Sequence, residues 1–347
     1  MDSRPTDTRL ALLRQWLAGL PADLGLDIDS LRPASADASF RRYFRLDSAG
    51  GTRIVMDAPP PNEDCRPFVH VCDLLRQTGI NVPRILAQDL QAGLLLLTDL
   101  GEQTYYQAIQ DGLSDAQLQS LYRDALDTLA ALQRAPTTGL PAYDAARLRA
   151  ELDLFGQWYA ERHCRMPLDE AARRTLDQAF ATLVAHNAAQ PTVLVHRDFH
   201  SPNLMRSTRP AHGPNPGVLD FQDALAGPVS YDLASLVTDA RTTWEEPQQL
   251  DWAIRYWERA KAAGLPVPAD FADFHRDYEW MSLQRNLRIL GVFARLNHRD
   301  GKAAYLQHLP RVNAYVRQVA GRYRPFLPLI RLLDKLDGRA ATVGYTF

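Results

Sequence analysis

The sequence predicts an α+β fold of two lobes, a small lobe built on an antiparallel sheet and a larger lobe that is mostly helical. Short strand-like runs fill residues 30–100, helical periodicity dominates the chain after Gly101, and two short apolar runs interrupt the helices near position 200. A length of 347 residues leaves room for two domains with substantial cores. We expect the lobes to comprise residues 1–99 and 100–347.

The smaller lobe is expected to contain two helices and five strands. The first helix covers residues 4–20, where leucines recur at helical spacing, and the second lies within residues 61–79, which end in Gly79. Three strands precede the second helix and two follow it, an order that indicates a small antiparallel sheet. The expected strands are residues 31–35, 42–46, 53–57, 84–88 and 94–99.

The larger lobe is expected to begin with a helix over residues 114–133, in which Ser114 and Gln117 fit a capping box. Two short apolar strands, 192–195 and 217–221, interrupt the later helices, and the stretch RSTRPAHGPNPG between them is typical of a surface loop. The other expected helices are residues 145–163, 168–189, 230–240, 247–263, 269–296, 301–320 and 325–335.

The composition argues against several classes of protein. The 39 basic and 41 acidic residues give a formal net charge of −2, which offers no basic excess for nucleic acid or an anionic membrane surface. The longest strongly apolar run, Leu94–Leu97, is far shorter than the ~20 residues of a membrane span, and no signal peptide is recognised. Three cysteines without CxxC spacing predict buried thiols in a reducing compartment. We therefore expect a soluble cytoplasmic protein.

The densest group of polar side chains follows the two short strands, in VLVHRDFHSPNLM (193–205) and GVLDFQDA (217–224). Such a group must lie in a cleft or be paired, because isolated buried charges are costly. Asp198 and Asn203 are five residues apart on a loop and can point into one volume, where Asp220 can meet them. Two carboxylates and an amide oxygen suit Mg²⁺ and the proton of a hydroxyl group. Phosphoryl transfer needs this set of groups.

Asp198 and Asn203 have the spacing of the kinase catalytic loop, H-R-D-L-x-x-x-N, and Asp220 lies seventeen residues beyond Asn203, in the place of the DFG aspartate. With these three elements in order, the sequence resembles the aminoglycoside phosphotransferase family of protein-kinase-like small-molecule kinases over about residues 25–300. The resemblance implies a bilobal protein-kinase-like fold that binds ATP and Mg²⁺ between its lobes.

The resemblance also implies roles for individual residues. Asp198 accepts the proton of the acceptor hydroxyl or orients that hydroxyl, and Asn203 and Asp220 hold Mg²⁺. His200 matches the family's histidine at the fifth position of the loop, where it orients Asp198 or touches the acceptor, with a purely structural role as the alternative. Asp232, in GPVSYDLASL, matches the family's D-L-A aspartate and is expected to accept amide hydrogens of the loop.

Three further segments look like the bacterial anomeric sugar kinases: ASFRRYFR (38–45), VMDAPP (55–60) and LQRNLRILGVFARL (283–296). Those enzymes phosphorylate the C1 hydroxyl of N-acetylmuramate and N-acetylglucosamine in cell-wall peptidoglycan recycling, so the resemblance implies a small-molecule amino sugar as the partner. One alternative is a kinase of another hydroxyl acceptor, such as an aminoglycoside, choline or homoserine. The other is a non-catalytic pseudokinase that senses a nucleotide or a sugar.

The sequence departs from the kinase pattern where the nucleotide phosphates should bind. Met56 stands where the third strand should carry a lysine, and no lysine occurs anywhere near it. The segment ADASFRR (36–42) has no glycine, although a Gly-rich turn is expected there. We expect Arg41 or Arg42 to supply the missing positive charge, because an arginine fork matches phosphate oxygens. Ser39 and nearby backbone amides are expected to cap the phosphates.

Two short segments have both a functional and a structural interpretation. Backbone groups of Thr98, Asp99 and Leu100 are expected to bind adenine at the hinge between the lobes, and the alternative is an ordinary strand end. Glu63 and Asp64 are interpreted as carboxylates that complement a helix dipole, without a functional role.

Three arginines share one side of the helix expected over residues 269–296, namely Arg285, Arg288 and Arg295. They either face the acceptor, since a muramyl sugar carries a lactyl carboxylate, or form a solvated basic face. The arginine-rich half of the chain after residue 240 disfavours an aminoglycoside, because a polycationic acceptor needs an acidic pocket.

Overall fold

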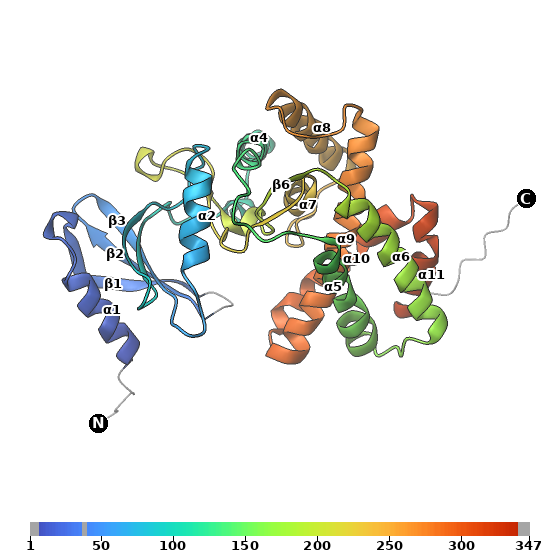
Figure 1. Ribbon diagram of the computed structural model, residues 1–347, viewed down its shortest axis with the longest axis horizontal. Coiled ribbons are helices and arrows are strands. Elements are labelled where there is room, and N and C mark those ends of the chain that lie inside the picture. Colours follow the sequence, from blue (N-terminus) through green and yellow to red (C-terminus); the bar gives the residue numbers. More distant parts are fainter. Residues whose placement is uncertain (1–6, 37–39, 339–347) are drawn as a thin grey trace, which may run out of the picture. The chain divides into compact units, whose positions relative to one another are not determined.

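The structure is a computed structural model that describes residues 7–36 and 40–338. A five-stranded antiparallel sheet occupies the N-terminal part of the chain, and helices make up most of the remainder (Figure 1). The predicted α+β class is confirmed.

The chain forms two compact units. The first unit consists of the described residues up to Gln103 together with Met205–Asp223, and the rest of the chain forms the second unit. The lobes expected from the sequence instead keep Met205–Asp223 with the helices. In the structure Asn81 ties this hairpin to the first unit, because its Nδ2 donates to the carbonyl of His212 at 2.8 Å and its own carbonyl accepts the Val218 amide at 2.8 Å.

The sheet of the first unit has the strand order β1-β2-β3-β5-β4, and each neighbouring pair is antiparallel. Two helices, α1 and α2, lie on opposite sides of the sheet (Figure 1). All seven elements were expected from the sequence, with ends shifted by up to five residues. Their bounds are α1 (Thr8–Ala18), β1 (Leu26–Ala36), β2 (Arg42–Ser48), β3 (Gly51–Asp57), α2 (Arg66–Arg76), β4 (Ile85–Asp89) and β5 (Leu94–Thr98).

The apolar run Leu94–Leu97 lies in β5, and both faces of this strand are covered. Alternate leucines of the run pack with Leu13 and Leu17 of α1 in one core cluster, and the others are buried on the opposite face. Successive side chains of a strand point to opposite faces of the sheet. A central strand with both faces covered is therefore apolar at every position.

Helices dominate the second unit, with α9 at its centre. This helix is thirty residues long, and α5, α6, α7 and α10 pack around it. Buried side chains of α5, α6, α9, α10 and α11 form the main core of the unit. None of the helices formed by the described residues is both long enough and apolar enough to span a bilayer. The bounds are α3 (Tyr105–Asp111), α4 (Asp115–Leu132), α5 (Ala145–Leu154), α6 (Glu170–Ala188), α7 (Tyr231–Val237), α8 (Glu246–Ala262), α9 (Phe271–Asp300), α10 (Leu309–Ala320) and α11 (Leu327–Leu336).

Three helical features differ from the sequence-based expectation. The helix expected over residues 301–320 begins only at Leu309, because Ala303–His308 form a 3₁₀-helix. The helix α3 was not expected, although Thr104 and Gln107 form a capping box at its start. The helix expected over residues 145–163 is continuous, but its second half, Phe155–His163, is π-helical. The capping box of Ser114 and Gln117 at the start of α4 is confirmed.

Two small sheets carry the segments around position 200. Their pairs are β6 (Thr192–Val195) with β9 (Leu225–Pro228), and β7 (Leu204–Met205) with β8 (Gly217–Val218). The expected strand 217–221 is therefore too long, and β9 was missed. The strand stops before Asp220 because this residue has a φ of +63°, a left-handed conformation that extended strands do not contain.

The three cysteines are free thiols as expected, but the predicted burial is wrong for Cys164, which is partly exposed. Cys65 and Cys72 are buried, and burial raises the pKa of each thiol to about 11. At neutral pH both thiols are therefore protonated, and they act as small apolar side chains of the first unit.

Candidate active site

A buried carboxylate on α7 holds the start of the loop that follows β6. Asp232 accepts the His196 amide on Oδ2 at 2.7 Å and the Arg197 amide on Oδ1 at 2.9 Å. Asp232 is fully buried, so these bonds fix the loop backbone in a place that water does not reach. This confirms the role expected for Asp232. Arg197 has a φ of +77°, a strained conformation of the kind that gathers at functional sites.

A second buried carboxylate holds the far end of the same loop. Asp239 accepts the Ser201 amide at 3.2 Å and the Ser201 hydroxyl on Oδ2, and its Oδ1 accepts the Arg241 amide at 3.0 Å. Burial would raise the pKa of Asp239, but His200 and the bond from Ser201 lower it overall. Asp239 was not predicted from the sequence, although a second aspartate in the apolar run DLASLVTDA signals a buried polar anchor.

Asp198 lies on the loop between these two anchors, and its side chain is partly exposed. Among the described residues, none donates a hydrogen bond to its carboxylate. Burial would raise the pKa of Asp198, but Arg288, His200 and two further arginines outweigh burial and lower the pKa to about 2. The carboxylate is therefore ionised at neutral pH and able to accept a hydrogen bond from a hydroxyl group.

The structure brings Asn203 next to Asp198. The Asn203 nitrogen Nδ2 donates to the Asp198 carbonyl at 2.9 Å, and the His200 amide donates to the same carbonyl at 3.0 Å. The donating nitrogen fixes the orientation of the amide group, so a cation at this residue would meet the oxygen Oδ1. An amide oxygen is a hard ligand of the kind that Mg²⁺ takes.

Asp220 belongs to the first unit, whereas Asn203 belongs to the second. Gln222 Nε2 donates to Asp220 Oδ1 at 2.8 Å, and the ring of Phe221 packs on Phe68 of α2 with centroids 4.7 Å apart. These contacts hold Asp220 in its strained backbone conformation. The carboxylate of Asp220 is a hard oxygen donor, as is the amide oxygen of Asn203, and each is of the kind that Mg²⁺ takes.

His200 is buried, with 8% of its surface exposed. Its Nδ1 lies 3.4 Å from Arg241 Nη1 and 3.8 Å from Asp239 Oδ1. Burial lowers the pKa of His200 to about 4, despite the opposing effect of Asp239. The ring is therefore neutral at physiological pH and can orient neighbours by hydrogen bonds only. Its catalytic role stays a prediction.

In the first unit, Arg42 is fully engaged by carboxylates. Its Nε and Nη2 donate to Asp57 Oδ2 at 3.0 and 2.6 Å, and its Nη1 donates to Asp7 at 2.5 Å. Asp57 ends β3 and is fully buried, and Arg9 donates to its other oxygen at 2.7 Å. Arg42 therefore joins α1 to the sheet.

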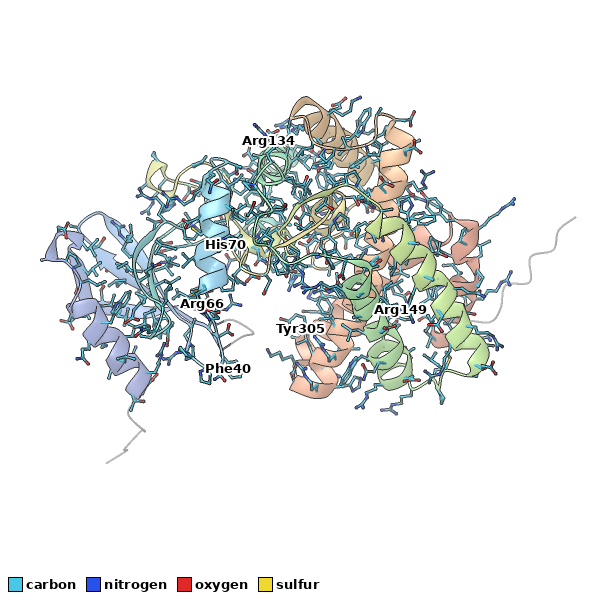
Figure 2. The ribbon with its side chains drawn as sticks, in the orientation of Figure 1. Phe40, Arg66, His70, Arg134, Arg149 and Tyr305 are labelled. Carbon is cyan, nitrogen blue, oxygen red and sulfur yellow. The ribbon has the colours of Figure 1, made fainter. Side chains whose placement is uncertain are left out.

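Arg41 has a different environment. Its Nε lies 3.4 Å from Glu63 Oε2, and Glu63 Oε1 accepts the Phe40 amide at 3.2 Å. The interpretation of Glu63 as a helix N-terminal carboxylate is wrong, because its carboxylate instead binds the turn before β2. For Asp64 the interpretation fits, since its Oδ1 accepts the amide of Arg66 at the start of α2, at 2.9 Å. Phe40 is 64% exposed (Figure 2), and Ser39 lies outside the described residues.

The end of β5 is held by an internal network. The Thr98 amide donates to the Arg84 carbonyl at 2.9 Å, so it is already used within the sheet. Asp99 receives Arg45 Nε at 2.6 Å and Nη2 at 3.1 Å, together with the Thr52 hydroxyl at 2.8 Å. Leu100 is buried. The side chain of Asp99 therefore has a structural role, and adenine binding by the backbone of this segment stays a prediction.

A cluster of charges surrounds Glu151 of α5. Arg197 Nη2 lies 2.7 Å from Oε1, Arg288 Nε lies 3.3 Å from Oε2, and the Tyr143 hydroxyl donates to Oε2. One carboxylate thus neutralises an arginine of the loop and an arginine of α9. Glu151 was not predicted from the sequence, because no local pattern marks it and its partner Arg197 lies 46 positions away.

For Arg285, the alternative that the three arginines of α9 form a solvated basic face is wrong. This side chain is only 2% exposed, whereas Arg288 and Arg295 are partly exposed. The centre of α9 is enclosed by neighbouring helices, so even its polar side is buried.

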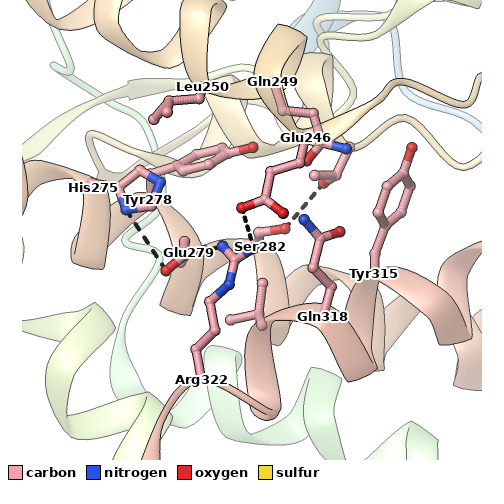
Figure 3. A pocket seen from close by; sticks show the side chains of 12 residues that line it. Glu246, Gln249, Leu250, His275, Tyr278, Glu279, Ser282, Tyr315, Gln318 and Arg322 are labelled. Atoms are coloured by element: carbon pink, nitrogen blue, oxygen red, sulfur yellow. Dashed lines mark hydrogen bonds and ion pairs between the residues drawn. The ribbon is translucent and has the colours of Figure 1, made fainter.

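A separate pocket lies among α8, α9 and α10 (Figure 3), and none of the expected site residues lines it. Its charged groups satisfy one another, since Arg322 contacts both Glu246 and Glu279. Glu279 also accepts the Tyr323 hydroxyl at 2.6 Å and lies 3.7 Å from His275 Nδ1. This pocket is therefore a self-contained polar network and not the candidate site.

Comparisons with known proteins identify the family of the chain. Residues 30–271 match the model of the phosphotransferase enzyme family. The chain is 45% identical over 342 residues to the N-acetylmuramate/N-acetylglucosamine kinase of Pseudomonas putida, an alignment that covers 96% of this chain and 98% of the relative. It is 48% identical over 307 residues to the protein of the same name from Pseudomonas aeruginosa, with 88% of each chain covered.

A solved structure shows the same fold. The crystal structure of aminoglycoside phosphotransferase APH(2'')-Ib, bound to ADP, matches with a TM-score of 0.58 and 12% sequence identity. The match covers 89% of this chain and 98% of that chain. This likeness confirms the predicted kinase-like fold.

Proposed function

The chain belongs to the phosphotransferase enzyme family, and we propose that it is a kinase that transfers the γ-phosphoryl group of ATP to the C1 hydroxyl of N-acetylmuramate and N-acetylglucosamine. Relatives at 45% and 48% identity carry the name of that activity. The observation that carries the proposal is the doubly anchored loop, in which Asp198 is ionised and its carboxylate accepts no bond from the described residues.

Asp198 accepts a hydrogen bond from the sugar hydroxyl and aims its oxygen at the γ-phosphorus. A carboxylate with a pKa of about 2 is a weak base, so its contribution is chiefly orientation. This suits phosphoryl transfer, where positioning and electrostatics supply most of the catalysis. It also suits an anomeric hydroxyl, which is more acidic than an ordinary alcohol.

Asn203 and Asp220 are the residues that would hold Mg²⁺, through an amide oxygen and a carboxylate. When bound, the metal neutralises charge on the nucleotide phosphates. Asp232 and Asp239 position Asn203 indirectly, because they hold the two ends of its loop.

Arg41, rather than Arg42, supplies the positive charge that the nucleotide phosphates need. Arg42 is taken up by the buried Asp57 and by Asp7, whereas Arg41 follows the turn before β2, where Glu63 Oε2 lies 3.4 Å from its Nε. An arginine fork that shares one carboxylate can still bind phosphate oxygens. The reaction takes place in the cytoplasm, where ATP is available.

A non-catalytic sensor of nucleotide or sugar is the second candidate, and Met56 at the lysine position motivates it. The unbonded Asp198 and the oriented amide of Asn203 favour the enzyme, because a sensor has no need of a carboxylate held ready for a hydroxyl. The names of the relatives favour an amino sugar over another acceptor.

The test is the identity of the product. The protein is incubated with ATP, Mg²⁺ and N-acetylglucosamine, and the product is examined by phosphorus NMR with proton coupling. We expect one sugar phosphate whose phosphorus couples to the anomeric proton. Phosphate on any other carbon, or ADP without sugar phosphate, would contradict the proposal.

A further inference from the structure

Two nitrogens of the Arg285 guanidinium, Nε and Nη1, are buried without a hydrogen-bond partner among the described residues. The residue is 2% exposed. A buried charge without a hydrogen-bond partner is costly, and such groups in native proteins have a specific reason. One reason is a ligand that brings the missing acceptor.

The carboxylates around Arg285 are committed elsewhere. Glu151 is shared by Arg197 and Arg288, and it also accepts the Tyr143 hydroxyl. The buried carboxylates of Asp232 and Asp239 accept hydrogen bonds from backbone amides of the loop and from the amide of Arg241. Among the described residues, none of these three carboxylates forms an ion pair with Arg285.

Arg285 acts electrostatically on the candidate catalytic residues. Asn286, the next residue of α9, donates from Nδ2 to Thr238 Oγ1 at 3.3 Å, and Asp239 beside Thr238 accepts the Ser201 amide of the loop at 3.2 Å, so this stretch of α9 packs next to the loop. The charge of Arg285 helps to lower the pKa of Asp198 and that of His200, yet among the described residues it forms no ion pair with Asp198. Arg288, one turn further along α9, has the larger effect on Asp198 but is already paired with Glu151. A small molecule whose hydroxyl meets Asp198 can thus offer an anionic group to Arg285.

We propose that Arg285 binds the lactyl carboxylate of N-acetylmuramate and so determines how well this protein uses the acidic sugar. The inference rests on the proposed function. The arginine fork matches a carboxylate with two parallel hydrogen bonds, a geometry that neither a hydroxyl nor an acetamido oxygen reproduces. N-Acetylglucosamine has the same C1 hydroxyl and the same acetamido group but no carboxylate. Arg285 therefore distinguishes two substrates that are otherwise alike at the reacting end.

The experiment compares Arg285→Met with wild type on both sugars, at saturating ATP and Mg²⁺. We expect kcat/KM for N-acetylmuramate to fall about 10- to 100-fold, the range for a lost hydrogen bond to a charged group. For N-acetylglucosamine it should stay within about threefold, and Tm should stay or rise, because removing an unpaired buried charge does not destabilise the fold. The matched control is Arg276→Met, on the same helix but exposed and paired with Asp273 at 2.9 Å.

A second arm changes the ligand and needs no variant. The methyl ester of N-acetylmuramate lacks the negative charge. For wild type, kcat/KM on the ester should be lower than kcat/KM on the acid by about the same 10- to 100-fold. For Arg285→Met, the ester and the acid should give about the same kcat/KM. An equal loss on both sugars would assign Arg285 to a shared group, such as the transferred phosphoryl, and overturn the inference. Unchanged activity on N-acetylmuramate would overturn it as well. Activity of wild type on N-acetylglucosamine tests the proposed function separately.

Discussion

Arg41 and Glu63 form an ion pair that joins the turn before β2 to the segment before α2, with Nε of the arginine 3.4 Å from Oε2 of the glutamate. In protein kinases a lysine on the third strand pairs with a helix glutamate and contacts the phosphates. Here that strand position is Met56, which is buried. An arginine and a glutamate from other positions thus provide a pair of the same charges in the same unit.

This pair leads to opposite expectations for two adjacent arginines. Arg41→Ala should lower kcat/KM for ATP about 10- to 100-fold, because a charged contact with phosphate is lost, and should leave stability nearly unchanged. Arg42→Ala should instead destabilise the protein by about 2 kcal/mol, since the buried Asp57 would keep only Arg9. Steady-state kinetics over a range of ATP concentrations and urea unfolding measure both effects. A loss of ATP use in Arg42→Ala with Arg41→Ala unaffected would reverse the assignment.

Replacing Asp232 should slow the reaction without weakening substrate binding. The Asp232 carboxylate accepts hydrogen bonds from the backbone amides of His196 and Arg197. In Asp232→Asn an NH₂ group faces one of these two amides and cannot accept its hydrogen bond. We expect kcat to fall about 10- to 100-fold, KM values to stay within a few fold, and stability to drop by about 2 kcal/mol. The control is Asp251→Asn, a partly exposed residue of α8 that is paired with Arg255. A stability loss with unchanged kcat would mean that the loop keeps its geometry without Asp232.

The packing of α9 depends on Gly291. A Cβ at this position would lie 2.7 Å from the Phe155 amide nitrogen and closer still to the Leu154 carbonyl group, so the backbones could not approach as they do. Gly291→Ala should destabilise the protein by about 3 kcal/mol, measured by chemical unfolding. Gly156→Ala is the control, because a Cβ there meets only side chains at 3.5 Å or more. Equal, small effects of the two changes would show that α9 and α5 are not packed as described.

The buried His200 should make stability depend on pH. Its folded-state pKa of about 4 lies below the ordinary value of 6.5, so between these values the unfolded chain binds a proton that the folded protein does not. Stability should therefore fall as pH decreases from 6.5 to 4, by an amount on the order of 3 kcal/mol from this residue. Urea unfolding at pH 7.5, 6 and 5 should show a shallower decline for His200→Gln than for wild type. If the free energy of unfolding declined equally in wild type and His200→Gln, a group other than His200 would cause the pH dependence.

The sequence was informative where the determinants are local. The spacing of Asp198 and Asn203 lies within one loop, and the helices and strands of the first unit follow from periodicity and turn residues over short windows. The role of Asp232 was predictable too, because it belongs to a motif only a few tens of residues downstream.

The rest depended on contacts between distant segments. Glu151 neutralises Arg197 from 46 positions away, and Glu63 meets Arg41 only because α2 packs beside the sheet. Periodicity could not reveal the burial of Arg285 either, since the surrounding helices enclose both sides of α9 at its centre. The strand β9 was missed because its pairing with β6 follows a turn that begins at the strained Asp220.

The most direct test of the central claim is coupled ADP release with ATP and Mg²⁺, for wild type and Asp198→Asn. The acceptors are N-acetylmuramate, N-acetylglucosamine, kanamycin, choline and homoserine. The account predicts turnover on the two amino sugars alone, with kcat at least about 100-fold lower in Asp198→Asn while ATP binding persists. Turnover on both sugars that survives in Asp198→Asn, or ATP binding without turnover on either sugar, would contradict it.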